Sequence, residues 1–278
     1  MKLFFRKLGQ GKPLFILHGL FGLSDNWNTV GKILSPSPTL PLRKGEENIS
    51  IYLIDLRNHG SSPHSDEWTY PAMANDILAL MKNEKLEKII LMGHSLGGKV
   101  AMQFAAMYTE KLEKLIVVDM APKDYSGNQF DFIEKLLAIN LVEMKNRKEA
   151  EVEFRKIIKD EATIQLLLKN IQWMPHPLSL CEGEGENSRT LEWKFNLKVI
   201  AENQKKIGKT FSLGNKPIET STLFIRGEKS NYILDSDIPQ MKKHFPNSKI
   251  ETIAGAGHWV HSDKPMQFIK VIKDFVSL

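Results

Sequence analysis

The stretch "KIILMGHSLGGKVAMQFAAMY", residues 88–108, decides the fold. It begins as a short apolar run typical of a buried strand and continues as a helical segment. Between the two lies Gly93-His94-Ser95-Leu96-Gly97, a G-x-S-x-G pattern. A serine on so tight a strand-to-helix turn adopts strained backbone angles, so the positions two before and two after it come close together and favour glycine. The pattern therefore predicts a nucleophilic Ser95 at a helix N-terminus; the alternative is a glycine-rich turn without chemistry.

A serine hydroxyl needs a base, and "IAGAGHWVHSDKP" supplies His258. This histidine follows the last predicted strand in a glycine-flanked turn that lets an imidazole point inward. It comes 163 positions after Ser95 (258 − 95), the chain order of folds in which the nucleophile precedes the histidine. His261 is the nearest competitor, and a surface or supporting role explains it more simply.

A developing oxyanion needs N–H donors. The residue after the nucleophile, Leu96, supplies one of them. In "FILHGLFGLSDNW" the His18-Gly19 turn follows a predicted strand, so that the N–H of Leu20 can point into the site. Phe21 is the alternative donor, and its side chain could instead line an acyl pocket.

Apolar runs alternate with helical stretches along most of the chain. "KLFFRKL" and "PLFILHG" flank Gly9-Gln10-Gly11 and predict an N-terminal antiparallel hairpin. Several later runs are apolar on both faces, as strands of a parallel sheet covered on two sides must be. The predicted strands are "ISIYLIDL", 88–93, 114–120, 221–227 and 248–255, and the predicted helices are 70–85, 98–109, 235–244 and 264–276. This alternation predicts an α/β fold with a doubly wound, mostly parallel sheet.

Two stretches break the alternation. Residues 35–48, "SPSPTLPLRKGEEN", are typical of a surface loop. Residues 124–212 lack strand signals, carry helical runs and are too long for a loop. We therefore expect an α/β core from 1–123 and 213–278, and a helical cap from 124–212 that follows the strand ending at Asp119 and covers Ser95. Within the cap, "CEGEGENS" at 181–188 is expected to be mobile. The cap's large apolar residues could line a groove or form its own core: Phe130, Phe132, Leu136, Leu137, Trp173, Trp193 and Phe195.

The composition gives no indication of several other classes of function. The 278 residues carry a net charge of +5, with lysine and arginine interleaved with acids, so neither a nucleic-acid partner nor stable membrane insertion is indicated. One cysteine, Cys181, allows no internal disulfide, which fits a reducing, cytoplasmic location. The histidines show no metal-ligand spacing, so we expect neither a metal nor an organic cofactor. Nothing in the sequence indicates the oligomeric state.

The order of these motifs resembles that of α/β-hydrolases, and more narrowly that of the YbfF/ABHD11-like serine esterases. The hairpin, the "HG" loop, "DLRNHGSSP", "GHSLGGKVAMQFA" and "AGAGHWVHSDKP" carry the resemblance, which covers about residues 2–277. Residues 35–48 and part of 175–190 depart from it. The resemblance implies an α/β-hydrolase fold in which "DLRNHGSS" closes the floor of the site in a mainly structural role. The candidate pocket residues are Phe21, Asn58, His59, His94 and Trp259.

The carboxylate that orients the histidine is harder to find. In many α/β-hydrolases it lies in the loop that here reads "RGEKSNYILDSD". Glu228 comes too early in that loop, and capping of the next helix is enough to explain Asp235 and Asp237. Asp119 instead ends the apolar run "KLIVVD", where a charge needs a partner. In the resembling group the acid sits at this position and a serine occupies the later one, as Ser230 does.

We therefore expect Asp119 to orient His258, with Ser230 as an auxiliary hydrogen-bonding neighbour; a structural capping role for Asp119 is the alternative. The expected activity is hydrolysis of carboxylic esters, or of acyl thioesters such as acyl-CoA, through an acyl-enzyme. The rival functions are a cofactor-free haloperoxidase, perhydrolase or lyase on the same scaffold, and a ligand-binding member without catalysis.

Overall fold

The computed structural model describes residues 1–35, 48–125, 131–175, 189–209, 212–214 and 216–276. Nearly all of the expected 35–48 loop lies outside the described residues, as do Phe130 and the 181–188 segment. In the part that is described, no helix is both long and apolar enough to cross a bilayer.

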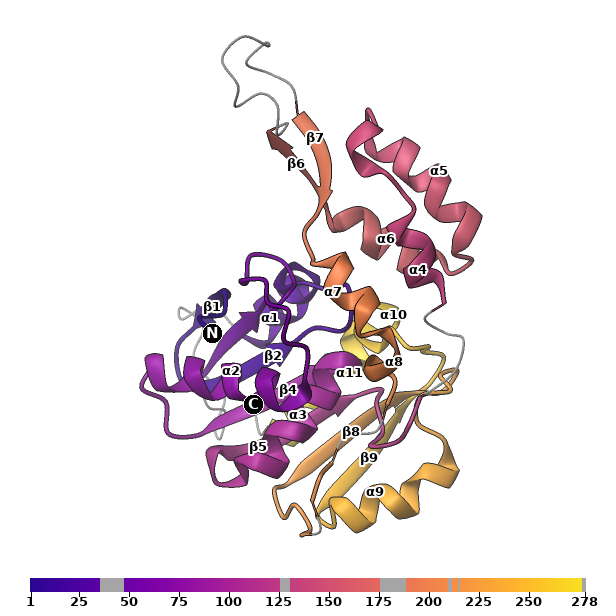
Figure 1. Ribbon diagram of the computed structural model, residues 1–278. Coiled ribbons are helices and arrows are strands. Elements are labelled where there is room, and N and C mark those ends of the chain that lie inside the picture. The colour runs from indigo at the N-terminus through magenta and orange to yellow at the C-terminus, as the bar shows by residue number, and fades with distance from the viewer. Residues whose placement is uncertain (36–47, 126–130, 176–188, 210–211, 215, 277–278) are drawn as a thin grey trace.

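A seven-stranded sheet forms the centre of the molecule (Figure 1). In spatial order its strands are β1 (Phe5–Gly9), β3 (Ile49–Ile54), β2 (Lys12–Leu17), β4 (Ile89–His94), β5 (Leu112–Val118), β8 (Thr222–Gly227) and β9 (Ser248–Ile253). β1 runs antiparallel to β3, and every other neighbouring pair is parallel. The predicted α/β fold with a mostly parallel sheet is confirmed.

The predicted N-terminal hairpin is wrong in its pairing. β1 and β2 follow each other in the chain, but β3 lies between them and pairs with both. The two strands differ in burial: Leu14, Phe15 and Ile16 of β2 are fully buried, whereas most of β1 is half-buried or exposed. A strand that is apolar on both faces is stabilised in the interior of a sheet, and a polar strand suits its edge.

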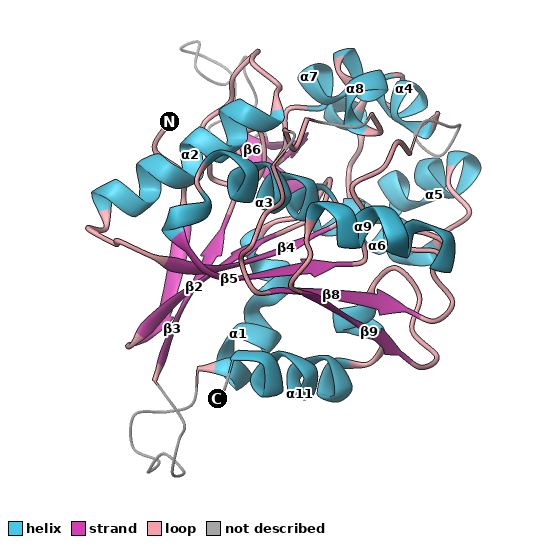
Figure 2. Cartoon of the chain, turned by 90° about the horizontal axis from the view of Figure 1, so that it is seen from below, coloured by secondary structure: helices cyan, strands magenta, loops and turns pink. Residues whose placement is uncertain are grey.

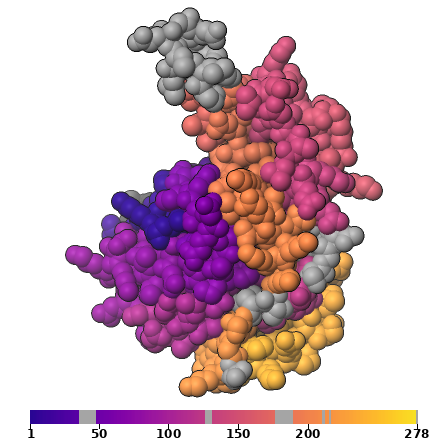
Figure 3. All heavy atoms as spheres, in the orientation of Figure 1, coloured from indigo at the N-terminus to yellow at the C-terminus, as the bar shows by residue number. Residues whose placement is uncertain are grey.

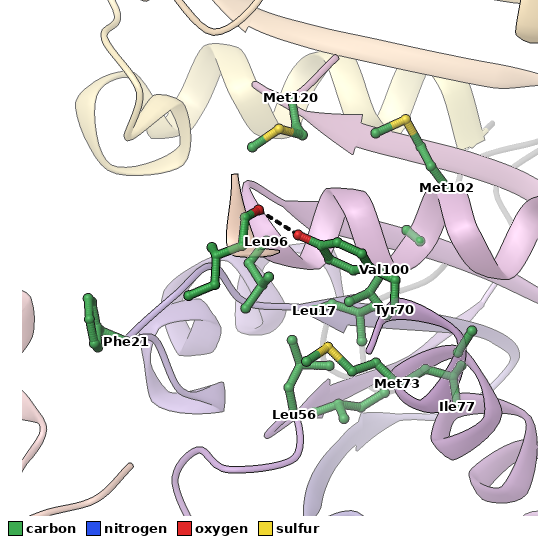
Figure 4. Packing of buried hydrophobic residues seen from close by; sticks show 14 of the residues in the cluster. Leu17, Phe21, Leu56, Tyr70, Met73, Ile77, Leu96, Val100, Met102 and Met120 are labelled. Atoms are coloured by element: carbon green, nitrogen blue, oxygen red, sulfur yellow. Dashed lines mark hydrogen bonds between the residues drawn. The ribbon is translucent and has the colours of Figure 1, made fainter. Parts of the chain in front are cut away.

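Helices cover both faces of the sheet (Figure 2). Along β2, Phe15 and Leu17 join the core on one face, while Leu14 and Ile16 join the core on the other. The first face packs against α2 (Tyr70–Asn83), α3 (Leu96–Met107) and α9 (Ile238–His244), and the second against α1 (Asn28–Leu34), α10 (Val260–Asp263) and α11 (Pro265–Val276). Figure 4 shows part of the first core, where α2 and α3 meet.

The chain between β5 and β8 forms a layer that projects beyond the core (Figures 1 and 3). Its elements are α4 (Phe132–Leu137), α5 (Arg147–Ile157), α6 (Glu161–Lys169), β6 (Ile171–Pro175), β7 (Arg189–Trp193), α7 (Leu197–Glu202) and α8 (Gln204–Ile207). The expectation that this segment lacks strands is wrong, because β6 and β7 form an antiparallel pair. Only Ile171, Thr190 and Leu191 of that pair are buried, so its apolar pattern was too short to indicate strands.

Candidate active site

Ser95 lies between the end of β4 and the start of α3, with the strained backbone angles φ 53° and ψ −117°. A Cβ atom on Gly93 would lie 2.1 Å from the carbonyl oxygen of Gly97, and one on Gly97 would lie 2.6 Å from the carbonyl oxygens of Leu17 and His18. Both contacts are too short for real atoms, so the requirement for two glycines is confirmed. The turn presents the serine side chain at the N-terminus of α3, where free N–H groups favour negative charge.

Asp119 directly follows β5 and is completely buried. Its Oδ2 lies 2.7 Å from His258 Nδ1 and also accepts a hydrogen bond from the Ser230 hydroxyl, while its Oδ1 accepts from the Gly227 N–H at 3.2 Å. Three donors offset the cost of burying a carboxylate. Because Nδ1 of His258 donates to this carboxylate, Nε2 is the nitrogen left to exchange protons.

Backbone strain gathers at this edge of the sheet. Among the described residues, the non-glycine residues with positive φ are Phe21, Asn58, Lys85, Ser95 and Asp119. All but Lys85 lie in loops that follow the carboxyl ends of β2, β3, β4 and β5. Such strain persists where the surrounding structure holds it in place, and it is typical of functional sites.

The loop after β2 is held by two buried histidines. His59 Nε2 accepts the N–H of Phe21 at 3.3 Å, and His18 Nε2 accepts the N–H of Leu56 at 3.0 Å. The N–H of Phe21 is therefore engaged, which favours Leu20 over Phe21 as the donor to an oxyanion.

Burial keeps four histidines neutral around the site. It lowers the pKa of His18 to about 4 and the pKa values of His59 and His261 to about 3, and it places that of His94 well below the usual value. The ring of His94 donates from Nε2 to the main-chain carbonyl of His258 at 2.9 Å. His261 is not a surface residue, because its ring stacks on Trp27 with centroids 4.1 Å apart.

Ser95 and His258 line one cavity of about 460 Å³, which we call the outer cavity. Of the five pocket candidates, Phe21, His94 and Trp259 line it as well. Asn58 and His59 are not among the residues that line this cavity. The side-chain amide of Asn58 exchanges hydrogen bonds with the backbone of Ser65 at 2.8 and 2.9 Å, and His59 holds the Phe21 N–H. The segment between β5 and β8 also contributes to the lining, with Phe132, Asp160, Ala162, Thr163 and Leu166.

Two residues that the sequence did not single out border Ser95. Tyr232 stacks on the His258 ring with centroids 3.7 Å apart, and its position two residues after Ser230 was the available signal. Lys99 is buried one turn after Ser95, and its ammonium donates to the carbonyl oxygens of residues 207, 208 and 209. No local pattern indicates a buried lysine whose partners lie more than 100 residues away in sequence.

The three acids near the end of β8 point away from His258. Glu228 accepts the N–H of Gly255 at 2.8 Å, and Asp235 pairs with Arg226 at 2.7 Å. Asp237 accepts the N–H of Leu234 at 2.8 Å, which caps the helical turn before α9 as expected.

These features match those of known proteins. A family model described as "alpha/beta hydrolase fold" matches residues 12–265. The chain belongs to the α/β-hydrolase family. Within this family it is 34% identical to the sn-1-specific diacylglycerol lipase ABHD11 of Danio rerio, over 96% of this chain and 79% of the relative. It is 31% identical to esterase YbfF of Escherichia coli, over 96% of this chain and 94% of the relative. The resemblance to YbfF/ABHD11-like proteins is therefore confirmed.

A solved structure called a marine microorganism esterase is 38% identical, with a TM-score of 0.86 over 99% of both chains. The names of these α/β-hydrolases support an ester-hydrolysing enzyme. Within the described ranges, no three histidine, cysteine, aspartate or glutamate side chains gather in a way that could hold a metal ion.

Proposed function

We propose that this α/β-hydrolase is a serine carboxylic ester hydrolase with Ser95, His258 and Asp119 as its catalytic triad. The observation that carries the proposal is the 2.7 Å contact between His258 Nδ1 and the buried Asp119 carboxylate, next to a cavity that His258 shares with the strained Ser95. A histidine oriented by a carboxylate can take the proton of a serine hydroxyl as it attacks a carbonyl carbon.

In the proposed reaction, Ser95 Oγ passes its proton to His258 Nε2 and forms a bond to the acyl carbon. The N–H groups of Leu20 and Leu96 hold the oxyanion. The C–O bond to the alcohol then breaks, and the alcohol leaves with the proton from His258. Water gives a proton to His258, attacks the acyl-enzyme and releases the acid and Ser95. Asp119 fixes the tautomer of His258 throughout, and Ser230 holds the carboxylate.

The segment 124–212 is proposed as a lid on a core formed by 1–123 and 213–278. Phe132 and Leu166 of this segment face Ser95 across the outer cavity. The side-chain amide of Asn170 also donates to the carbonyl of Phe21 at 2.6 Å, which ties the segment to the loop after β2. The lid would exclude water and shape the substrate site.

The proposal covers oxygen esters first, and thioesters such as acyl-CoA through the same attack on a carbonyl. A panel of acyl-CoAs from acetyl to palmitoyl, compared with oxygen esters, decides whether thioesters belong to it. Peroxide-dependent halogenation with little ester turnover would point to a haloperoxidase or perhydrolase instead. A protein that binds ligands but fails to react with a fluorophosphonate probe would be a non-catalytic member.

The direct test is hydrolysis of p-nitrophenyl acetate by the Ser95→Ala variant. We expect kcat to fall by about 10⁵-fold or more, because the nucleophile is lost, and fluorophosphonate labelling to disappear. Ser221→Ala is the matched control, since Ser221 is an exposed serine immediately before β8. Undiminished hydrolysis or labelling in Ser95→Ala would refute the proposed nucleophile.

A further inference from the structure

A second, smaller cavity also has Ser95 in its lining. This inner cavity has a volume of about 20 Å³. Besides Ser95 it is lined by Leu20, Leu96, Lys99, Met120, Tyr125, Ile207, Gly208 and Tyr232. About 10–15 Å³ of such space holds one water molecule, so the inner cavity accepts little more than one methyl-sized group. The two cavities share Leu20, Ser95 and Tyr232, and they differ in volume by more than twentyfold.

The position of His258 decides which part of an ester enters which cavity; this step rests on the proposed function. The departing alcohol oxygen takes its proton from His258 Nε2, so the alcohol must lie on the side of that ring. Gly257, His258 and Trp259 line the outer cavity, whereas the residues that line the inner cavity come from other loops and from α3 and α8. The alcohol therefore occupies the outer cavity, and the acyl chain is directed into the inner one, beside the Leu20 and Leu96 backbone.

The lining of the inner cavity includes a charged side chain that resists displacement. Lys99 is 1% exposed, and its ammonium donates to the carbonyls of Ile207, Gly208 and Lys209 at 3.2, 2.9 and 3.0 Å. It also lies 4.9 Å from the centre of the Tyr125 ring. A longer acyl chain would have to break these bonds or place methylene groups against a buried cation, and both are unfavourable.

The wall that includes Ile207 is anchored as well. The Tyr70 hydroxyl donates to the Ile207 carbonyl at 2.7 Å, the bond drawn as a dashed line in Figure 4. The backbone N–H of Tyr125 donates to the Gly208 carbonyl at 2.7 Å. The chain at 207–208 is therefore bonded to the core at several points, and the inner cavity cannot widen by a simple shift of this segment.

The outer cavity, by contrast, has further open space next to it. A groove of about 430 Å³ shares the lining residues Ala162, Leu166 and Trp259 with the outer cavity and extends to Asp25 and Lys169. The alcohol side of the ester thus has a large cavity with a second groove beside it.

We infer that the enzyme is selective for esters of short, unbranched acids, chiefly acetyl and propionyl esters, of alcohols that are larger than the acyl group. Lys99 and Met120, which both line the inner cavity, together limit the size of the acyl group. Both act as specificity-determining residues of the proposed reaction.

Two substrate series measured on the wild-type enzyme test this inference. In p-nitrophenyl esters from acetyl to decanoyl, kcat/KM should fall by at least about tenfold between propionyl and hexanoyl, as a filled pocket rejects added methylenes. In alkyl acetates from methyl to octyl, kcat/KM should stay level or rise. A steep fall in the alkyl acetate series with a level acyl series would reverse the assignment and overturn the inference, and so would level or rising values in both series.

Matched variants then test which cavity limits the size of the acyl group. Met120→Ala should raise the ratio of hexanoyl to acetyl turnover by about tenfold, because it removes a side wall of the inner cavity. Met120→Val is the milder substitute if the alanine variant does not fold. Leu166→Ala enlarges the outer cavity and should leave this ratio within about twofold. An unchanged ratio in a folded Met120 variant would contradict the inference.

The proposed function fails in a different way from this inference. Absence of turnover for every ester, or turnover that survives Ser95→Ala, would remove the proposed function. Ser95-dependent turnover that increases from acetyl to octanoyl would leave the proposed function intact and remove only the acyl limit.

Discussion

The histidines at the carboxyl edge of the sheet are of two kinds. His18, His59, His94 and His261 are buried, and burial keeps their rings neutral. His258 faces a cavity and has a carboxylate at Nδ1. The buried rings are therefore neutral structural groups: those of His18, His59 and His94 form hydrogen bonds, and that of His261 stacks on Trp27. In the proposed triad, His258 is instead the ring that carries charge.

His258 differs from the buried histidines because of residues that follow two neighbouring strands, β5 and β8. The loop after β5 contributes Asp119, and the loop after β8 contributes Ser230, whose hydroxyl donates to that carboxylate. The acids of the second loop bond elsewhere, Asp235 to Arg226 and Asp237 to Lys123. In the proposed triad, a carboxylate at the right strand end, rather than the number of acids nearby, prepares His258 for proton transfer.

Of the changes considered, replacing Asp119 by asparagine should most strongly remove the difference between His258 and the buried histidines. An amide at this position leaves His258 without a charged partner and favours the wrong tautomer, so we expect kcat for p-nitrophenyl acetate to fall by about 10⁴-fold. The thermal unfolding midpoint, measured by circular dichroism, reports whether the variant is folded.

Asp235→Asn is the control for that variant, since Asp235 is an exposed acid in the chain that follows β8. It should retain nearly wild-type turnover. A folded Asp119→Asn with normal activity, together with an inactive Asp235→Asn, would move the orienting role to the chain after β8.

The buried histidines should make the fold sensitive to acid. Their pKa values lie below the unfolded value of about 6.5, so below that pH the unfolded chain binds protons that the folded chain does not. The stabilisation present above pH 6.5 is then lost as the pH falls toward the folded values of about 4 for His18 and about 3 for His59 and His261. Between pH 6.5 and 5.5 the loss is about 1 kcal/mol for each histidine, or about 3 kcal/mol for these three together.

Urea unfolding at pH 6.5, 6.0 and 5.5 measures this loss. In His59→Gln the pH dependence of the free energy of unfolding should weaken by the equivalent of about one proton. The glutamine amide oxygen can still accept the Phe21 N–H. An unchanged slope in that variant would mean that His59 takes up protons in the folded state.

The sequence predicted the parts of the fold that depend on local patterns. The strand-to-helix turn at Ser95 and the helices after β3 and β8 follow from glycine spacing and apolar periodicity. The pairing of β1 was predicted wrongly because a glycine turn between two apolar runs does not reveal which strand each run joins. That choice depends on β3, whose chain begins about 30 residues after β2 ends.

The same division applies to the site. Ser95, Asp119, Ser230 and His258 could be proposed because each stands at the end of a predicted strand or next to a recognisable motif. Lys99 could not be proposed from the sequence. A lysine in a helix is expected to be exposed, and only the folded chain brings three carbonyl groups close to its ammonium.

Moving the carboxylate from the end of β5 to the chain after β8 would test whether His258 can use a partner at either strand end. The double variant Asp119→Gly/Ser230→Asp places an acid on the β8 side, within reach of the space that Asp119 leaves. Glycine also tolerates the positive φ of 48° at position 119. We expect kcat/KM about 100-fold above that of Asp119→Gly alone, as His258 regains a charged partner. Asp119→Gly/Ser230→Asn is the uncharged control and should show no gain; equal rates for the two double variants would exclude relocation.

The smallest effect should come from Ser230 alone. Its hydroxyl donates to Asp119 and accepts the N–H of Tyr232 at 3.2 Å, so it links the carboxylate to the residue stacked on His258. Ser230→Ala removes one hydrogen bond to a charged group, worth about 1.5 kcal/mol, and kcat/KM should fall about tenfold. Ser230→Thr keeps the hydroxyl and should recover most of the activity, and Ser236→Ala, an exposed serine nearby, should be neutral. A loss in Ser230→Ala as large as that in Asp119→Asn would show that the carboxylate cannot hold His258 without the loop after β8, so that the two strand ends act as one unit.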